Sequence, residues 1–297
     1  MKIVEWLKIA QQVIYLTCAM LFCFAAGTFG SGLVSLSVLT GSLSTTPGAG
    51  QVNPWQAFLP LLIFSFAVAV MFVYIIRRSC WHGLKLAFAI FIAIFGLMTV
   101  VIQLESLLFL NSRLPAGFMR SIFLMGFLTA ALFAPFAVII TGRVKKAAPP
   151  PDKEHLVMPV GMWVWKLALI GLCYVVLYLA AGYFIAWQSP ALRKYYGGYD
   201  PGTIIAHVGW LITTSPHIFP FQFFRGLVWM LCVLPIIKMH RGRGMEMGLT
   251  VAALFIVWNL QLFMPNPLMP AEVARIHFIE MSVSNSIFGF IVGILLA

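Results

Sequence analysis

Long apolar runs, separated by short charged or turn-rich segments, follow one another along the whole chain. A helix needs about 20 mostly apolar residues to cross a lipid bilayer. Eight runs are long enough, and they cover approximately residues 9–29, 55–76, 84–104, 118–141, 161–186, 217–237, 246–264 and 274–296. The pattern predicts an all-α integral membrane protein with eight transmembrane helices.

The composition supports this prediction. Hydrophobic residues make up 62% of the chain and charged residues only 9%, whereas soluble domains carry about 25% charged residues. The net charge of +11 does not indicate nucleic-acid binding, because the Lys and Arg residues lie in short loops between apolar runs. The five cysteines are an odd number and lie mostly inside the runs, which argues against a disulfide scaffold.

The distribution of basic residues predicts an orientation. If the N-terminus lies inside, thirteen of the 19 Lys and Arg residues fall on the inner side and six on the outer side. Cytoplasmic loops are enriched in Lys and Arg, so this orientation is favoured over its reverse. We therefore expect a protein of the plasma (inner) membrane with both termini in the cytoplasm.

Two pairs of similar strings indicate an internal duplication. CAMLFCFAAGTF at residues 18–29 resembles CYVVLYLAAGYF at 173–184, and PAGFMR at 115–120 resembles PAEVAR at 270–275. Both pairs are 155 residues apart. Similar constraints from the bilayer are the alternative explanation. The duplication predicts two parallel four-helix repeats (4+4), residues 1–142 and 159–297, related by an axis along the membrane normal.

The connections between the predicted helices differ in character. Residues 143–158 are charged and proline-rich, which is typical of a semi-rigid linker and places a cytoplasmic connection between the repeats. The longer outer connections are residues 30–53 and 189–216. The second contains Tyr195-Tyr-Gly-Gly-Tyr-Asp-Pro-Gly, where the glycines and the Asp-Pro step predict turns.

The last predicted helix is the most polar. Successive helical residues are rotated by about 100°, so one side of this helix carries His277, Glu280, Ser284 and Asn285. Ionisable residues within a membrane span are functional candidates by default. Glu280 could accept a proton or bind a cation, and His277 could relay protons or orient the carboxylate. The alternative is a self-satisfied pair that fixes helix packing.

Further polar residues are expected at the same outer depth: Arg225, Asn259, Gln261 and Glu105. Arg225 is the predicted partner of Glu280, since a charge beside lipid needs compensation. Asn259 and Gln261 face nearly opposite sides of one helix, and interhelical hydrogen bonding is the expected role of either. Arg120 and Arg275 occupy matching positions in the two repeats and are expected to contact lipid phosphates, with substrate contact as the alternative.

The polar stripe is confined to the second repeat. At the offset of 155, the first repeat has Ile122, Met125, Thr129 and Ala130 in the corresponding positions. This asymmetry favours a specialised site in the second repeat over a structural role shared by both. The H-x-x-E spacing supplies two metal ligands where a metal site needs three or four, so neither a metal site nor a cofactor is predicted.

Three classes of function are compatible with these features. The favoured class is a permease or carrier of a small solute, with an outward-facing polar site around Glu280, His277 and Arg225. The alternatives are an intramembrane or lipid-modifying enzyme at the outer leaflet, and a non-catalytic membrane scaffold or assembly subunit. Whether the protein is an enzyme stays open. The expected partners are membrane lipids and a small-molecule substrate or a proton, without nucleic acid.

Overall fold

The computed structural model describes residues 2–32, 54–109, 114, 116–145, 158–197, 199–264, 266 and 269–297. In this part of the chain, eight helical spans are long and apolar enough to cross a membrane, so the predicted all-α architecture with eight spans is confirmed. The spans are formed by α1 (Lys2–Gly30), α3 (Pro54–Arg77), α4 to α5 (Gly83–Phe95 and Val101–Phe109), α6 (Phe118–Ile140), α7 (Val160–Ala181), α10 (Ile218–Met239), α11 (Met245–Asn259) and α12 (Ala271–Leu296).

Large apolar side chains cover much of the surface of these helices. On α7, for example, Leu172, Val176 and Phe184 on the following turn are more than half exposed. Water would make such a surface unfavourable, because large exposed apolar patches drive association or insertion into a bilayer. Helices suit the hydrocarbon core because most of their backbone hydrogen bonds form within the helix. Surface and length therefore agree on a membrane protein.

The described chain packs as two compact units. Unit 1 contains residues 1–152 together with Cys232–Arg241, and unit 2 contains residues 153–231 together with Gly242–Ala297. Helix α10 therefore contributes its first turns to unit 2 and its last turns to unit 1. The predicted linker 143–158 and outer connection 30–53 lie largely outside the described residues, which omit 146–157 and 33–53.

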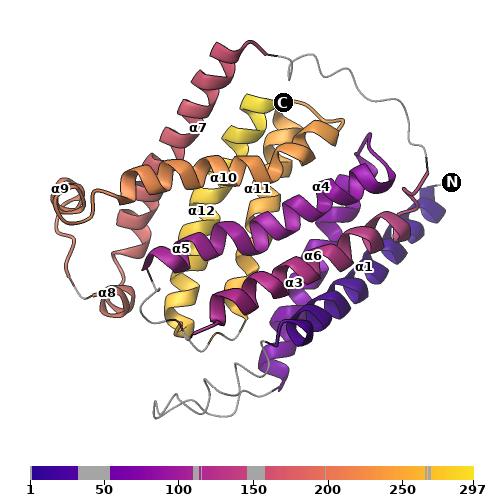
Figure 1. The fold of residues 1–297 in the computed structure, drawn as a ribbon, viewed down its shortest axis with the longest axis horizontal. Helices are drawn as coiled ribbons and strands as arrows, with labels where there is room; N and C mark the ends of the chain where they lie inside the picture. The colour runs from indigo at the N-terminus through magenta and orange to yellow at the C-terminus, as the bar shows by residue number, and fades with distance from the viewer. Residues whose placement is uncertain are drawn as a thin grey trace. The chain divides into compact units, whose positions relative to one another are not determined.

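In unit 1, α6 packs on both α1 and α4, and α1 also packs on α3 (Figure 1). Small residues allow the close approach: Gly27 of α1 lies against Thr129, and Gly126 of α6 lies against Thr99. The last turns of α10 join unit 1 through backbone hydrogen bonds. Cys80 N donates to Met239 O at 2.8 Å, and Arg241 N donates to Arg78 O at 2.9 Å.

In unit 2, α11 and α12 form the most extensive helix pair, and α7 also packs on α12 (Figure 1). A Cβ at Gly293 of α12 would lie 2.6 Å from the Cα of Gly248 on α11, so the two backbones are in direct contact. Glycine pairs favour such close packing in membranes. In both units the first span contacts the second and the fourth, and the third contacts the fourth. The 4+4 repeat itself stays a prediction.

The connection between α7 and α10 contains two helices that the sequence patterns did not predict, α8 (Pro190–Tyr196) and α9 (Ile204–Thr214). Each begins at a side-chain cap: Ser189 Oγ accepts from Leu192 N at 3.4 Å, and Thr203 Oγ1 accepts from Ala206 N at 3.2 Å. Such caps satisfy backbone N–H groups that the first turn leaves open. The predicted turn lies between the two helices, where Gly197 and Gly202 have positive φ.

Candidate functional site

The side chains of His277 and Glu280 meet on the polar side of α12. Residues three positions apart are neighbours on a helix, and His277 Nδ1 lies 2.9 Å from Glu280 Oε2. If the carboxyl is ionised it can only accept a hydrogen bond, and the imidazole proton would then be on Nδ1, with Nε2 as an acceptor. The pair is therefore oriented as well as in contact.

A third member of this group comes from α8. The Tyr196 hydroxyl lies 3.1 Å from His277 Nε2, where it can donate to the ring nitrogen. Helix α8 is held in place by an apolar cluster around Leu192, which packs with Ala186 and with Val273 of α12. We call the chain of Tyr196, His277 and Glu280 the Tyr-His-Glu chain. It connects helix α8 of unit 2 to a carboxyl in the long apolar helix α12.

Glu280 is nearly buried, with 8% of the residue exposed, yet its two carboxyl oxygens differ. Oε2 contacts His277, while Oε1 makes no hydrogen bond with any residue of the described chain. Gly182, which directly follows α7, lies beside this oxygen, and a Cβ added there would lie 4.0 Å from Oε1. The missing side chain leaves room beside this oxygen.

The helical span that begins with α7 is irregular at Gly182. Residues Gly182–Ala186 form a π-helical turn, η4, in which Trp187 N donates to Gly182 O at 2.8 Å. Such turns are rare and occur frequently at functional sites. A widened turn, a missing side chain and a carboxyl oxygen without a hydrogen bond therefore coincide. We regard this place as the centre of the candidate site.

Two buried amides continue the polar side of unit 2 beyond Glu280. Asn259 Nδ2 donates to Ser282 Oγ at 3.4 Å and so joins α11 to α12. Within the described chain, Asn259 Oδ1 and Asn285 Nδ2 have no hydrogen-bond partner. A buried polar atom without a partner costs about 1–3 kcal/mol, so a water or a bound solute is expected beside them. The Ser284 hydroxyl, by contrast, donates to the Glu280 carbonyl oxygen at 2.9 Å on its own helix.

Arg225 is a charged residue inside unit 2, with only 3% exposed. Its NH1 donates to Gln222 Oε1 at 3.4 Å, and its guanidinium carbon lies 5.8 Å from the ring centre of Tyr174. The face of an aromatic ring attracts a cation, which partly offsets the cost of burial. Among the described residues, Glu280 forms no ion pair with Arg225, so the predicted pairing of these two residues is not observed.

The remaining predicted site residues lie elsewhere. Gln261 is in a short 3₁₀ turn, η5 (Leu260–Phe263), and donates to Trp258 O at 3.0 Å. Glu105 is partly buried on α5 in unit 1, while Arg120 and Arg275 are exposed near the starts of α6 and α12. The functional roles assigned to these residues stay predictions. In the described part of the chain, no three His, Cys, Asp or Glu residues are grouped to hold a metal ion.

An aromatic cluster around His207 of α9 was not predicted from the sequence. The imidazole is 2% exposed; its Nδ1 is hydrogen-bonded to the Tyr199 hydroxyl, and its ring adjoins Tyr183 and Trp187. Burial lowers the pKa of His207 and raises the pKa of Tyr199, because both charged forms would lose solvation. Trp187 also packs on the apolar cluster around Leu192 that holds α8 in place. The same apolar cluster therefore contacts both the aromatic residues around His207 and the helix that carries Tyr196.

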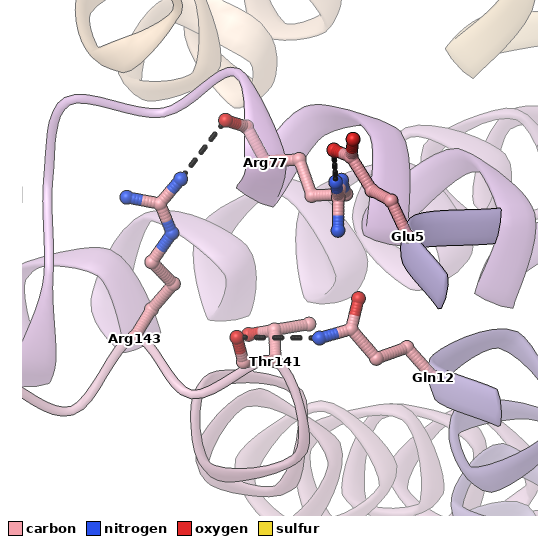
Figure 2. A network of polar contacts seen from close by, with 5 residues as sticks. All are labelled: Glu5, Gln12, Arg77, Thr141 and Arg143. Atoms are coloured by element: carbon pink, nitrogen blue, oxygen red, sulfur yellow. Dashed lines mark hydrogen bonds and ion pairs between the residues drawn. The ribbon is translucent and has the colours of Figure 1, made fainter. Parts of the chain in front are cut away.

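The sequence patterns also missed a polar network at the end of unit 1 that carries the N-terminus (Figure 2). Arg77 NH2 lies 2.7 Å from Glu5 Oε1, and Arg143 NH2 donates to the Arg77 carbonyl oxygen at 2.9 Å. Gln12 Nε2 donates to Thr141 O at 3.4 Å. The network joins α1, α3 and the residues that follow α6. The sequence alone does not show that these three segments meet.

Comparison of the chain with models of protein families, with curated proteins and with solved structures found no match.

Proposed function

We propose that the protein is a membrane carrier of a small solute and that Glu280 is its proton- or cation-binding group. The observation that carries the proposal is the state of this carboxyl. One oxygen is held by His277 at 2.9 Å, and the other makes no hydrogen bond to the described residues and lies beside Gly182. An ionisable group at this depth is costly and is typically retained for binding or proton transfer.

The neighbours of Glu280 fit a binding site that exchanges protons. A carboxyl in a membrane span can be neutralised by a proton or by a cation, and either changes how it attracts a solute. The Tyr-His-Glu chain offers a route for a proton between Glu280 and the outer segment of unit 2. The amides of Asn259 and Asn285 provide further buried hydrogen-bonding groups, as a polar solute requires.

The decisive test compares Glu280→Gln with Glu272→Gln. Glu272 is exposed in the first turn of the same helix, so both variants lose one carboxylate from α12. Purified protein is placed in vesicles containing a pH-sensitive dye, and a panel of amino acids, sugars and organic acids is added outside. We expect at least one solute to change the internal pH with the wild type and with Glu272→Gln. Unchanged proton movement with Glu280→Gln would remove Glu280 from the mechanism.

A second variant tests the space beside Glu280. In Gly182→Ala the new methyl group would meet no heavy atom closer than Oε1 at 4.0 Å, so the fold should tolerate it. The methyl group occupies space that a solute bound to Oε1 needs, and we expect the KM of transport to rise. Gly209→Ala on α9 is the control, because nothing lies within 4 Å of its added Cβ. An equal KM in both variants would contradict a site at Gly182.

A second candidate function is acid–base catalysis at the outer leaflet. The order of carboxylate, imidazole and hydroxyl in the Tyr-His-Glu chain is the order that activates a hydroxyl group in hydrolytic triads. In an enzyme of this kind the reacting group would be the Tyr196 phenol. Tyr196→Phe should then abolish turnover of a lipid or other substrate, whereas a carrier should still move its solute with an altered pH dependence.

A further inference from the structure

Three guanidinium groups from distant parts of the sequence converge at the end of unit 1 that carries the N-terminus. Arg77 is the last residue of α3, Arg143 follows α6, and Arg241 follows α10. Hydrogen bonds fix the positions: Arg143 NH2 donates to Arg77 O, and Arg241 N donates to Arg78 O, each at 2.9 Å. Figure 2 shows Arg77 and Arg143 beside one another. The fold, rather than the local sequence, creates this arginine cluster of Arg77, Arg143 and Arg241.

The cluster holds more positive than negative charge. Loss of solvation lowers the pKa of Arg143, and the charges of Arg241 and Arg77 lower it further. Arg77 pairs with Glu5, whose carboxylate side chain is itself 67% exposed. Arg143 and Arg241 form no ion pair with a carboxylate of the described residues, so their positive charges lack such a partner. Like charges held together are destabilising unless an anion compensates them.

The donors of the cluster are also incompletely used. A guanidinium has five N–H donors, and that of Arg143 makes one hydrogen bond with the described residues. The carbonyl of Arg143 accepts from Gly83 N at 2.9 Å, which places the start of α4 next to it. There, Lys85 Nζ lies 4.1 Å from the ring centre of Trp81. Tryptophan favours the headgroup layer of a membrane, so we expect the cluster at the depth of lipid phosphates.

We propose that the arginine cluster binds a phosphate-bearing anion, with the side chains of Arg143 and Arg241 as the main contacts. Paired N–H donors match the geometry of phosphate oxygens, which is why arginine is preferred for such anions. The phosphate belongs either to an anionic phospholipid or to a soluble compound. This site is separate from Glu280 and does not depend on the proposed transport.

The experiment measures binding to delipidated protein in neutral detergent. The probes are micelles containing phosphatidylglycerol, micelles containing phosphatidylcholine, and inorganic phosphate. We expect phosphatidylglycerol to bind saturably and to raise the Tm, and phosphatidylcholine to do neither. Equal stabilisation by inorganic phosphate at saturation would assign the site to a soluble compound, and no effect of phosphate would assign it to the lipid. The proposal is overturned if neither phosphatidylglycerol nor inorganic phosphate, the two probes with net negative charge, binds saturably, or if phosphatidylcholine binds as tightly as phosphatidylglycerol.

Matched variants distinguish a specific anion-binding site from a general attraction of anions to the positive charge of this surface. Arg143→Lys keeps the charge and loses the paired donors, and we expect it to weaken binding about tenfold. Lys8→Gln removes an exposed charge at the same end and should change binding little. General attraction predicts the reverse, an approximately fivefold loss for Lys8→Gln and none for Arg143→Lys. Arg241→Lys repeats the test without risk to folding, because its exposed side chain makes no hydrogen bond in the described chain.

Discussion

Substitution of Gly293 by alanine tests how closely α11 and α12 pack around the candidate site. The added Cβ would lie 2.6 Å from Gly248 Cα, 2.7 Å from Met247 O and 2.8 Å from Gly248 N. Ordinary contacts between carbon atoms are about 3.5–4.0 Å, so the helices would have to separate by about 1 Å. The atoms in the way belong to the backbone and cannot rotate aside.

The expected change in the free energy of unfolding combines two opposing contributions. Overpacking of a close interface costs about 1–3 kcal/mol, and the upper part of this range applies because backbone meets backbone. Alanine regains about 1 kcal/mol over glycine through its helix propensity. The net prediction for Gly293→Ala is a loss of about 1–2 kcal/mol.

Gly209→Ala provides the reference, since its Cβ would meet nothing within 4 Å in the middle of α9. This variant should gain up to about 1 kcal/mol. Unfolding in mixed micelles with increasing SDS, followed by circular dichroism, measures both variants against the wild type. If Gly293→Ala is as stable as Gly209→Ala, the close approach of α11 and α12 is refuted.

Three further measurements follow from other contacts. Because the pKa of buried His207 is lowered, the unfolded state binds more protons at this residue in mildly acidic solution. The contribution of His207 to the free energy of unfolding should be fully present above about pH 6.5 and be lost as the pH falls below it. His207→Gln should therefore show a weaker fall in the free energy of unfolding over this acidic range. The exposed Glu5–Arg77 pair should contribute less than about 1 kcal/mol in a double-mutant cycle, and a larger coupling would contradict its exposure. Ser282→Ala, which removes the acceptor of Asn259, should lower the free energy of unfolding by about 0.6 kcal/mol.

The eight spans could be predicted from sequence because the bilayer imposes one length and one polarity on each of them. α8 and α9 were missed because hydropathy over 20 residues cannot detect helices of 7 and 11 residues. Local signals were nevertheless present: Ser189 precedes Pro190, and Thr203 precedes an apolar run. Serine or threonine before proline or an apolar stretch is a helix start signal.

The candidate site was predictable only where it depends on one helix. The spacing of His277 and Glu280 requires that their side chains meet, and they do. Tyr196 comes from a segment 81 residues away, and no periodicity relates the two positions. The arginine cluster was missed for the same reason, since the sequence shows basic loops but not which of them converge.

The division of α10 between the two units has a consequence for the order of biosynthesis. Cys232 packs against Gly96, and Met239 and Arg241 bond to the backbone at Cys80 and Arg78. A ribosome makes Cys232, Met239 and Arg241 only after it has produced five complete spans and most of a sixth. The first half of the polypeptide must therefore wait in the membrane, incompletely assembled, until residue 241 has been translated and inserted.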